Sequence, residues 1–373
     1  CWKCGKTEME LFLHEYELPL KHPFTISRGT TTAQRTLIVE LRQDGVSGYG
    51  EAIANTYYDS PMNSMRARLQ SVQPLLHSET FRDTESFWKL CAGHLADASF
   101  VLSALDCAAH DLWGRLEGAP VHRLWGLDPA DAVPSSFTIG IAEVDVMVAK
   151  LAEMPGWPVY KIKLGTANDV EIIQCLGKQT DAAFRIDANC GWDIDTAVKM
   201  MAALDEFDVL FAEQPIAAGD PQALASLREK TDIPIMADES CFTVADAVQL
   251  VRHQAADILA VYPGKHGGLT EMRRITRVAR EAGIVCAMGS NLELGIATAA
   301  MLHIGIAEPS IDNERYPGDY LGPLYHQADL LTEPLELGPA VARVPEGPGL
   351  GVELDVDQLD HYRDASARAT QLG

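Results

Sequence analysis

Apolar and polar residues follow one pattern in the first third of the chain and a different pattern afterwards. Residues 9–20 alternate between apolar and polar as a strand does, and residues 36–52 predict a hairpin that turns at Asp44 and Gly45. Over residues 103–116 the apolar side chains recur at helical spacing, and Gly118 supplies the expected helix stop. The chain up to about residue 130 is therefore predicted to form an α+β unit.

Further along the chain, short β-rich runs recur with amphipathic helical stretches between them. Matched positions in successive runs lie 24–27 residues apart, and eight strand–helix repeats of that size are typical of a (β/α)8 barrel. An open doubly wound sheet is the alternative, but it would favour a Gly-rich phosphate-binding motif after its first strand, and the sequence has none there. The eight runs are residues 135–142, 159–165, 184–190, 209–215, 233–240, 258–265, 284–291 and 309–314.

These patterns together predict the α/β fold class. Residues 131–330 are expected to form a (β/α)8-type barrel that carries the chemistry, and residues 1–130 an α+β capping domain. Residues 331–373 begin with a stretch rich in proline and glycine, and we expect this C-terminal segment to return to the capping domain and complete it.

Composition and charge indicate which kinds of binding partner to expect. Hydrophobic residues make up 47% of the chain and the net charge is −23, which is typical of a globular protein that repels phosphate backbones and anionic lipid. No apolar run approaches the roughly 20 residues that span a bilayer. We therefore expect neither a nucleic-acid nor a membrane partner.

The cysteine pattern indicates the cellular compartment in which the protein is expected. Eight cysteines are scattered along the chain in the manner of small core residues, and the first residues show no pattern of a secretory signal. A reduced protein in the cytoplasm is therefore expected. Cys1 and Cys4 form the only C-x-x-C pair, and without a second pair at zinc-site spacing they do not favour a metal or redox role.

Acidic residues end three consecutive predicted strands of the barrel, where the strands should be apolar. They are Asp187, Glu213 and Asp238. At the mouth of a barrel these carboxylates would converge and repel one another unless a cation joined them, and oxygen ligands suit Mg²⁺ better than Zn²⁺. Any one of them could instead cap a helix or form an ion pair, but three at matched positions favour a metal site.

Lysines flank these carboxylates on both sides. Lys163 precedes them along the chain and Lys265 follows them, and Lys161 lies two residues before Lys163. A lysine acts as a base when neighbouring cations lower its pKa, although each lysine could instead only balance a carboxylate charge. A metal that binds a substrate carboxylate can stabilise the enediolate formed when the α-proton leaves, with a base on one face and an acid on the other.

In this order and spacing the motifs resemble those of the enolase superfamily, and within it the muconate lactonizing enzyme subgroup, over essentially the whole chain. The resemblance implies a Mg²⁺-dependent enzyme, with one ion per subunit, that assembles as a homo-oligomer. The roles that it implies are acid/base catalysis for Lys163 and Lys265, metal binding for Asp187, Glu213 and Asp238, and supporting positions for Lys161, Asn189 and Glu239.

The resemblance also implies that capping loops close over the barrel mouth, and residues 21–29 and 54–59 are the candidates. The substrate contacts expected at the mouth are Ser27, Tyr57, Ser290 and Asp319. Asp319 matches the first acid of the Asp-x-Asp pair that holds the substrate ammonium in dipeptide epimerases, but the second acid is absent.

Nearby residues bear on the charge of the substrate. Asp312 and Glu314 are expected to make the eighth-strand side of the mouth anionic together with Asp319. Cation–π contacts are a further possibility for Tyr57, Tyr58 and Tyr320, while Arg28 and Arg315 would bind a second substrate carboxylate if they pointed inward.

The sequence therefore predicts an isomerase that abstracts the α-proton of a small carboxylate substrate, with racemisation or epimerisation of an amino-acid derivative (a dipeptide, an N-acylamino acid or a proline derivative) favoured. A muconate-type cycloisomerase and a dehydratase or lyase on the same scaffold are the alternatives. A binding or assembly protein without catalysis is disfavoured, because the three carboxylates and both lysines are all present.

Overall fold

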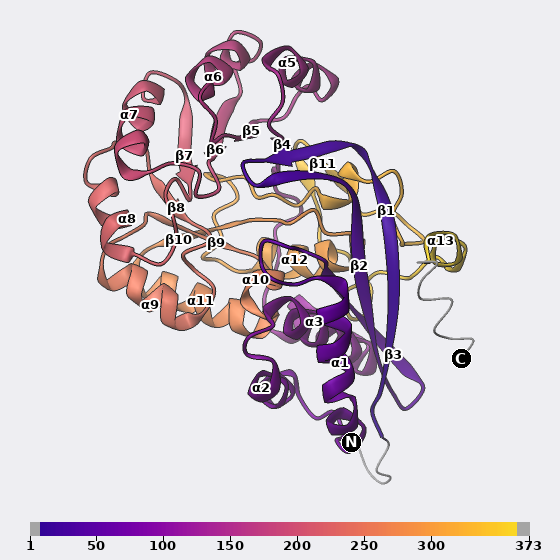
Figure 1. Ribbon diagram of the computed structural model, residues 1–373. Helices are drawn as coiled ribbons and strands as arrows, with labels where there is room; N and C mark the ends of the chain where they lie inside the picture. The colour runs from indigo at the N-terminus through magenta and orange to yellow at the C-terminus, as the bar shows by residue number, and fades with distance from the viewer. Residues whose placement is uncertain (1–7, 364–373) are drawn as a thin grey trace.

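The computed structural model describes residues 8–363, so the pair Cys1 and Cys4 lies outside the described residues. An antiparallel sheet with its helices, formed by the N-terminal part of the chain, lies beside a curled parallel sheet wrapped by the remaining helices (Figure 1). Among residues 8–363, no helix combines the length and the apolarity needed to cross a bilayer.

The capping unit begins with three antiparallel strands in sequential order, β1 (Glu10–Ile26), β2 (Gly29–Gln43) and β3 (Val46–Ile53). The predicted hairpin is confirmed, because Asp44 and Gly45 connect β2 to β3 with positive φ angles of 54° and 76°. Residues 21–29, predicted to be a loop, instead form the end of the β1–β2 hairpin, which turns within two residues.

Four helices complete this unit, and the longest packs directly on β3. A Cβ atom added at Gly50 of β3 would lie 1.9 Å from the carbonyl oxygen of Ala104, so the close approach requires glycine. The predicted helix stop is confirmed at Gly118, which has a left-handed φ of 68°. The helices are α1 (Met62–His77), α2 (Thr84–Leu95), α3 (Ser99–Glu117) and α4 (Val121–Leu124).

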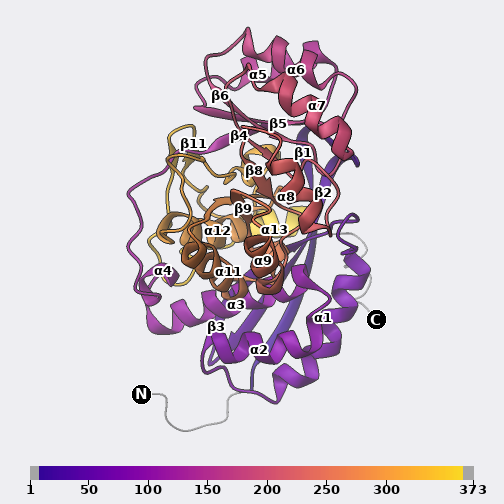
Figure 2. The ribbon, with the colours of Figure 1, turned by 90° about the vertical axis from the view of Figure 1, so that its left-hand side faces the viewer.

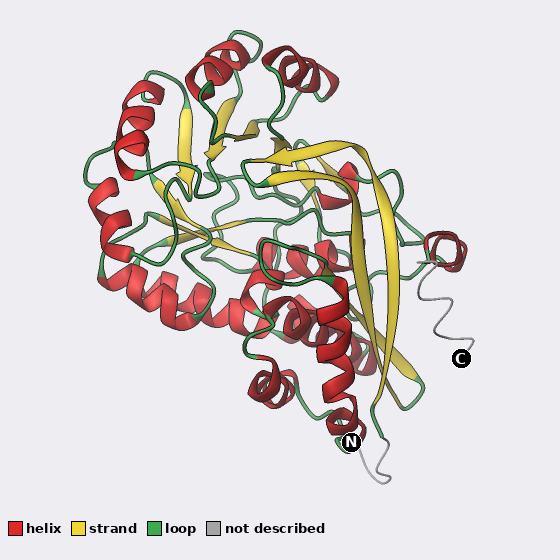
Figure 3. Ribbon diagram, viewed as in Figure 1, coloured by secondary structure: helices red, strands yellow, loops and turns green. Residues whose placement is uncertain are grey.

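The predicted barrel is confirmed as a parallel sheet of seven strands within the described part of the chain, with helices outside it (Figure 3). An inner cluster that includes Phe211, Met236 and Ala287 fills the space enclosed by the strands. In spatial order the strands are β4 (Ser136–Ile139), β5 (Val159–Lys163), β6 (Ala183–Asp187), β7 (Val209–Glu213), β8 (Ile235–Ala237), β9 (Ile258–Val261) and β10 (Val285–Met288).

The helices of this part form an outer ring, which Figure 2 shows above the helices of the capping unit. Their inward faces are apolar, as expected for helices that cover a parallel sheet. They are α5 (Val144–Glu153), α6 (Asp169–Gly177), α7 (Ile194–Leu204), α8 (Pro221–Arg228), α9 (Val244–Arg252), α10 (Pro263–His266), α11 (Leu269–Ala282) and α12 (Gly295–Ala307).

The eighth predicted strand differs from the other seven. It closes the barrel through two isolated parallel bridges, from Ile311 to Cys286 and from Gly318 to Ser135. Between the bridges the chain makes a turn in which Asp312 accepts a hydrogen bond from the backbone N–H of Arg315, and this turn interrupts the strand. A short 3₁₀ helix, η1 (Gly322–Tyr325), follows in place of an eighth α-helix.

The C-terminal segment runs back over both parts of the molecule. Its contacts with the capping unit include a bridge from Arg363 to Tyr16 and a hydrogen bond from the backbone N–H of Leu350 to the Asp111 carboxylate. It also pairs with the start of the barrel, where Ala342 bridges to Val133. Its elements are β11 (Leu337–Gly338), β12 (Val341–Ala342) and α13 (Val356–Tyr362).

Candidate active site

A cavity of about 490 Å³ lies at the carboxyl ends of the barrel strands, where parallel barrels place their chemistry. Charged side chains at the ends of β5, β6, β7 and β8 form its floor. Its outer wall comes from the capping unit, through Phe24, Ile26 and residues 28–35 of the β1–β2 hairpin and residues 54–58 after β3.

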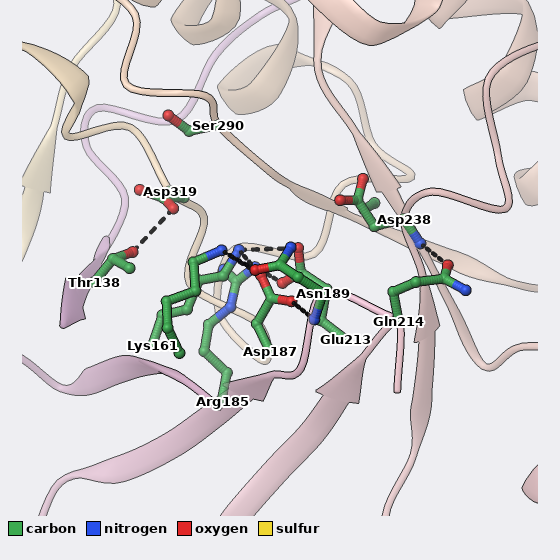
Figure 4. A network of polar contacts seen from close by, with 12 residues as sticks. Thr138, Lys161, Arg185, Asp187, Asn189, Glu213, Gln214, Asp238, Ser290 and Asp319 are labelled. Carbon is green, nitrogen blue, oxygen red and sulfur yellow. Dashed lines mark hydrogen bonds and ion pairs between the residues drawn. The ribbon is translucent and has the colours of Figure 1, made fainter. Parts of the chain in front are cut away.

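The three carboxylates predicted as metal ligands all line this cavity. Asp187 ends β6 and pairs in register with Glu213 at the end of β7, and Asp238 follows β8 directly. Figure 4 shows these side chains along one side of the site, with Lys161 and Arg185 beside Asp187 and Glu213. The three acids therefore face one cavity from adjacent strands.

Buried cations contact two of these acids, Asp187 and Glu213. The Lys161 ammonium nitrogen lies 3.1 Å from Asp187 Oδ2 and 2.9 Å from Glu213 Oε1. On the other side of Glu213, the Arg185 guanidinium lies 2.9 Å from Oε2. In this arrangement no three acidic, histidine or cysteine side chains of the described residues are gathered closely enough to hold one ion.

Lys163 reaches the cavity and pairs with the same acid. Its Nζ lies 2.5 Å from Asp187 Oδ2 and donates to Asn189 Oδ1 at 3.1 Å. Burial alone would raise the pKa of Asp187, but the ammonium groups of Lys163 and Lys161 outweigh it and hold that pKa below its ordinary value. Asp187 is therefore ionised at neutral pH.

Lys265 lies on the opposite flank, on the one-turn helix α10 that follows β9. Its Nζ is fully buried and donates to Asp238 Oδ1 at 2.6 Å and to the carbonyl oxygens of Asp238 and Ala260 at 2.9 Å. Burial would raise the pKa of Asp238, but this ammonium group lowers it. The lysine thus contacts the cavity through the Asp238 carboxylate.

Glu239 and Asn189, predicted as supporting residues, contact each other. Glu239 Oε1 accepts hydrogen bonds from Arg28 at 2.7 Å and from Asn189 Nδ2 at 3.3 Å. Burial, with repulsion from Asp238 and Asp187, raises the pKa of Glu239 to about 8. Asn189 has a positive φ of 46°, a conformation that asparagine tolerates better than most residues, and its backbone N–H donates to Asp187.

The predicted substrate contacts fall in different places. Asp319 lines the cavity opposite the carboxylate cluster and accepts a hydrogen bond from Thr138 Oγ1 at 3.1 Å, but has no ion-pair partner within residues 8–363 (Figure 4). Tyr57 and Ser290 also line the cavity. Ser27 does not, and its hydroxyl instead donates to the Asn189 carbonyl oxygen at 3.4 Å.

The prediction that Asp312 and Glu314 add charge to the mouth is wrong. The backbone N–H of Asp312 donates to Cys286 near the start of β10, whereas that of Asp319 donates to Met288 at its end. The turn in the eighth segment therefore leaves Asp312 at the far end of the barrel, and neither it nor Glu314 lines the cavity.

Two further expectations about this segment are also wrong. Tyr320 is fully buried and donates to Asn313 Oδ1, so it does not face a substrate cation. Arg315 lies over the Tyr316 ring, 5.0 Å from its centroid, and does not line the cavity. On the eighth segment only Asp319 faces the site.

Sequence reasoning assigned no role to three residues that build the site. Arg185 shares a face of β6 with Asp187, and strand alternation was the signal that would have found it. Thr138, at the end of the first barrel strand, holds Asp319. Gln214 accepts hydrogen bonds from the backbone N–H groups of Asp238 and Ser240, which fixes the loop after β8.

Two family models match the chain and together cover most of it. Residues 8–126 match the N-terminal domain described as "Mandelate racemase / muconate lactonizing enzyme, N-terminal domain". Residues 143–358 match the domain described as "Enolase C-terminal domain-like". The second match alone spans more than half of the chain.

Individual relatives extend over similar lengths. The chain is 37% identical to the L-Ala-D/L-amino acid epimerase of Flavobacterium johnsoniae, over 79% of this chain and 87% of that protein. It is 34% identical to muconate cycloisomerase 1 of Rhodococcus opacus, over 92% and 95%. A solved dipeptide epimerase from Cytophaga hutchinsonii, complexed with Mg and the dipeptide D-Ala-L-Val, superposes with a TM-score of 0.90 at 28% identity and covers 95% of this chain and 98% of that one.

Proposed function

Because the chain belongs to the mandelate racemase/muconate lactonizing enzyme family of the enolase superfamily, we propose that it is a Mg²⁺-dependent epimerase of dipeptides. One observation carries the proposal. Asp187, Glu213 and Asp238 line one side of a cavity, and the facing side holds an acid, Asp319, that lacks a cationic partner among the described residues.

The donor set suits a hard dication. Asp187, Glu213 and Asp238 offer carboxylate oxygens from three adjacent strands. In this structure they pair with Lys161, Lys163 and Lys265, and we propose that they would converge on one Mg²⁺ per subunit when the ion binds. Mg accompanies the dipeptide in the solved relative from C. hutchinsonii. When bound, the ion would stabilise the negative charge that grows on the substrate carboxylate as the α-proton leaves.

We propose that Lys163 and Lys265 handle the α-proton on opposite faces of the substrate. Lys163 ends β5 and Lys265 lies on α10, which follows β9, and β6, β7 and β8 lie between these two strands. One lysine as the free amine takes the proton, and the other as the ammonium donates one to the opposite face. Lys161 remains fully buried between Asp187 and Glu213, where it balances their charge.

Asp319 is the residue that favours a dipeptide over the alternative substrates. Asp319 is 5% exposed and its carboxylate accepts a hydrogen bond from the neutral Thr138 hydroxyl, so a substrate ammonium would supply its missing counter-charge. The second carboxylate of muconate, or the succinyl carboxylate of an N-succinylamino acid, would be repelled at the same place. The carboxylate end of a dipeptide would then lie at the three acids and its amino end at Asp319.

Two expectations from the sequence accompany this proposal. We propose a cytoplasmic enzyme that assembles from identical subunits, as the cysteine pattern and the family resemblance suggest. Size-exclusion chromatography with light scattering measures the number of subunits directly.

Proton NMR in D₂O with Mg²⁺ tests the proposed activity. With L-Ala-L-Xaa dipeptides we expect loss of the α-proton signal of the C-terminal residue and the appearance of the second diastereomer. Exchange with N-succinylamino acids alone, or lactone formation from cis,cis-muconate without any dipeptide exchange, would overturn the proposal.

A further inference from the structure

The turn that carries Lys265 is joined to the next helix by two glycines. Lys265 lies on α10, which ends at Gly267 with a left-handed φ of 74°, and Gly268 follows with a φ of 113° before α11 begins. The backbone of glycine is conformationally free, so this connection does not by itself fix the place of Lys265. Contacts from other parts of the chain therefore hold the turn.

The capping unit supplies such contacts through α2 and α3. Helix α3 lies beside α10 (Figure 1). From α2, Trp88 Nε1 donates to the carbonyl oxygen of Gly267 at 2.8 Å. From α3, the Phe100 ring packs on Gly264, where an added Cβ atom would lie 3.1 Å from the ring. The turn of Lys265 is thus packed against a different unit from the one to which it belongs.

Asp106 of α3 binds the first turn of α11, directly after the two glycines. This fully buried carboxylate accepts from the backbone N–H of Thr270 at 2.9 Å and from the Thr270 hydroxyl at 2.8 Å. The N-cap residue of α11 is Gly268, which has no side chain, so Asp106 supplies the capping oxygens from elsewhere in the sequence. A Cβ atom at Gly268 would lie 2.4 Å from Asp106 Oδ2, so the carboxylate also packs directly on the glycine pair.

Lys163 has a different kind of support. It ends β5, which is paired in parallel with β4 on one side and β6 on the other. Lys163 itself is in register with Asp187 of β6. The hydrogen-bond ladder of the barrel therefore fixes the backbone of this lysine.

From these contacts we propose that Asp106 is a positioning residue for Lys265, and that the capping unit thereby supports one of the two proton transfers and not the other. By capping α11 next to the glycine pair, the Asp106 carboxylate fixes residues 263–268 and with them the Lys265 ammonium group. A small displacement of an acid or base from its reactive geometry lowers a rate strongly. This inference rests on the proposed epimerase function, in which Lys163 and Lys265 serve opposite faces of the substrate.

Proton exchange measured separately for the two diastereomers tests the inference. With saturating L-Ala-L-Gln or L-Ala-D-Gln and Mg²⁺ in D₂O, Lys265→Ala first identifies the diastereomer that Lys265 deprotonates, as the one that no longer exchanges. Asp106→Ala should lower the initial exchange rate of that diastereomer by at least about tenfold relative to the other. Because both rates come from the same enzyme sample, a smaller folded fraction lowers both equally and leaves their ratio unchanged.

Further variants separate positioning from a general effect on folding. Asp106→Asn should recover part of the ratio, because its amide oxygen can accept from the backbone N–H of Thr270. Thr270→Val keeps that N–H and removes only the hydroxyl, so it should shift the ratio in the same direction by a smaller factor. Asp111→Ala is the matched control and should leave the ratio unchanged. It removes another buried carboxylate of α3, one that binds the backbone N–H groups of Tyr49 and Leu350.

The ratio of the two exchange rates decides the outcome. An unchanged ratio in Asp106→Ala, or in Thr270→Val if Asp106→Ala does not fold, would overturn the inference and leave the epimerase function in place. A shift of equal size in Asp111→Ala, or a selective loss of the other diastereomer, would overturn it as well. If the unmodified enzyme exchanged the α-proton of no dipeptide, the proposed function and this inference would both fail.

Discussion

Replacing Asp319 by asparagine isolates the charge that the account assigns to substrate recognition. The change keeps the shape of the side chain and an oxygen that accepts from Thr138 Oγ1, now 3.1 Å away. It removes the negative charge opposite the carboxylate cluster. The structure therefore predicts an effect on the amino end of the substrate and no effect on the proton transfer itself.

The size of the expected loss in kcat/KM follows from the burial of Asp319. Asp319 is 5% exposed, so a hydrogen bond from a substrate ammonium to it is little screened by solvent. Hydrogen bonds to charged groups contribute about 1.5–3 kcal/mol, which corresponds to a loss of about 10- to 150-fold in kcat/KM. The expected loss lies in this range for L-Ala-L-Gln.

The assay compares that substrate with N-acetyl-L-Ala-L-Gln, which lacks the ammonium group. Polarimetry or NMR gives kcat/KM for both substrates with the original enzyme and with Asp319→Asn. The acetylated substrate should change by no more than about twofold, as expected for a group that makes no charged contact. Thr138→Val is the matched control, because it removes only the hydroxyl that donates a hydrogen bond to Asp319. It should lower kcat/KM by a factor that corresponds to about 1 kcal/mol.

One result would refute the reasoning. If Asp319→Asn lowered kcat/KM for both substrates by the same factor, Asp319 would act on the barrel or on the lysines and not on the substrate ammonium. A gain of activity towards the free dipeptide would contradict the assignment even more directly.

Three further predictions follow from the buried ion pairs. Lys163→Ala and Lys265→Ala should each lower the epimerisation rate by at least about 100-fold, the smallest factor expected for a lost acid or base, which a polarimetric assay detects. Arg185→Met should destabilise the protein by about 3–5 kcal/mol in urea unfolding, because it removes the cation 2.9 Å from the buried Glu213; an unchanged midpoint would contradict this. Lys163 and Lys161 lower the pKa of Asp187 by more than burial raises it, so the ionised carboxylate stabilises the folded state above about pH 4. This contribution is lost as the pH falls below that value. Urea midpoints measured from pH 7 to pH 3 should show the loss, and Asp187→Asn should lack it.

The architecture could be predicted from the sequence because two of its patterns depend only on local residues and regular spacing. A positive-φ dipeptide between alternating strands determines a hairpin, as at Asp44 and Gly45, and a strand–helix repeat of constant length determines a parallel barrel. The position of Asp187, Glu213 and Asp238 at one edge then follows from the parallel direction of their strands. The eighth segment was misjudged because its turn depends on tertiary contacts and not on local propensity.

Side-chain direction could not be read from the chain in the same way. Asp312 lies seven residues before Asp319, yet only Asp319 reaches the mouth, since the turn between them consumes most of that length. Arg28 faces Glu239 from a position 211 residues away, and no spacing rule connects such residues. Lys265 was expected at the end of a strand and instead lies on the one-turn helix α10, where its ammonium still reaches Asp238.

Proton exchange in the two single-lysine variants tests the central claim most directly. With Mg²⁺ in D₂O, Lys163→Ala and Lys265→Ala should each still exchange the α-proton of one diastereomer of the dipeptide, a different one for each variant, and neither should interconvert the two. Exchange of the same diastereomer by both variants, or epimerisation by either one, would contradict the placement of the two lysines on opposite faces of the substrate.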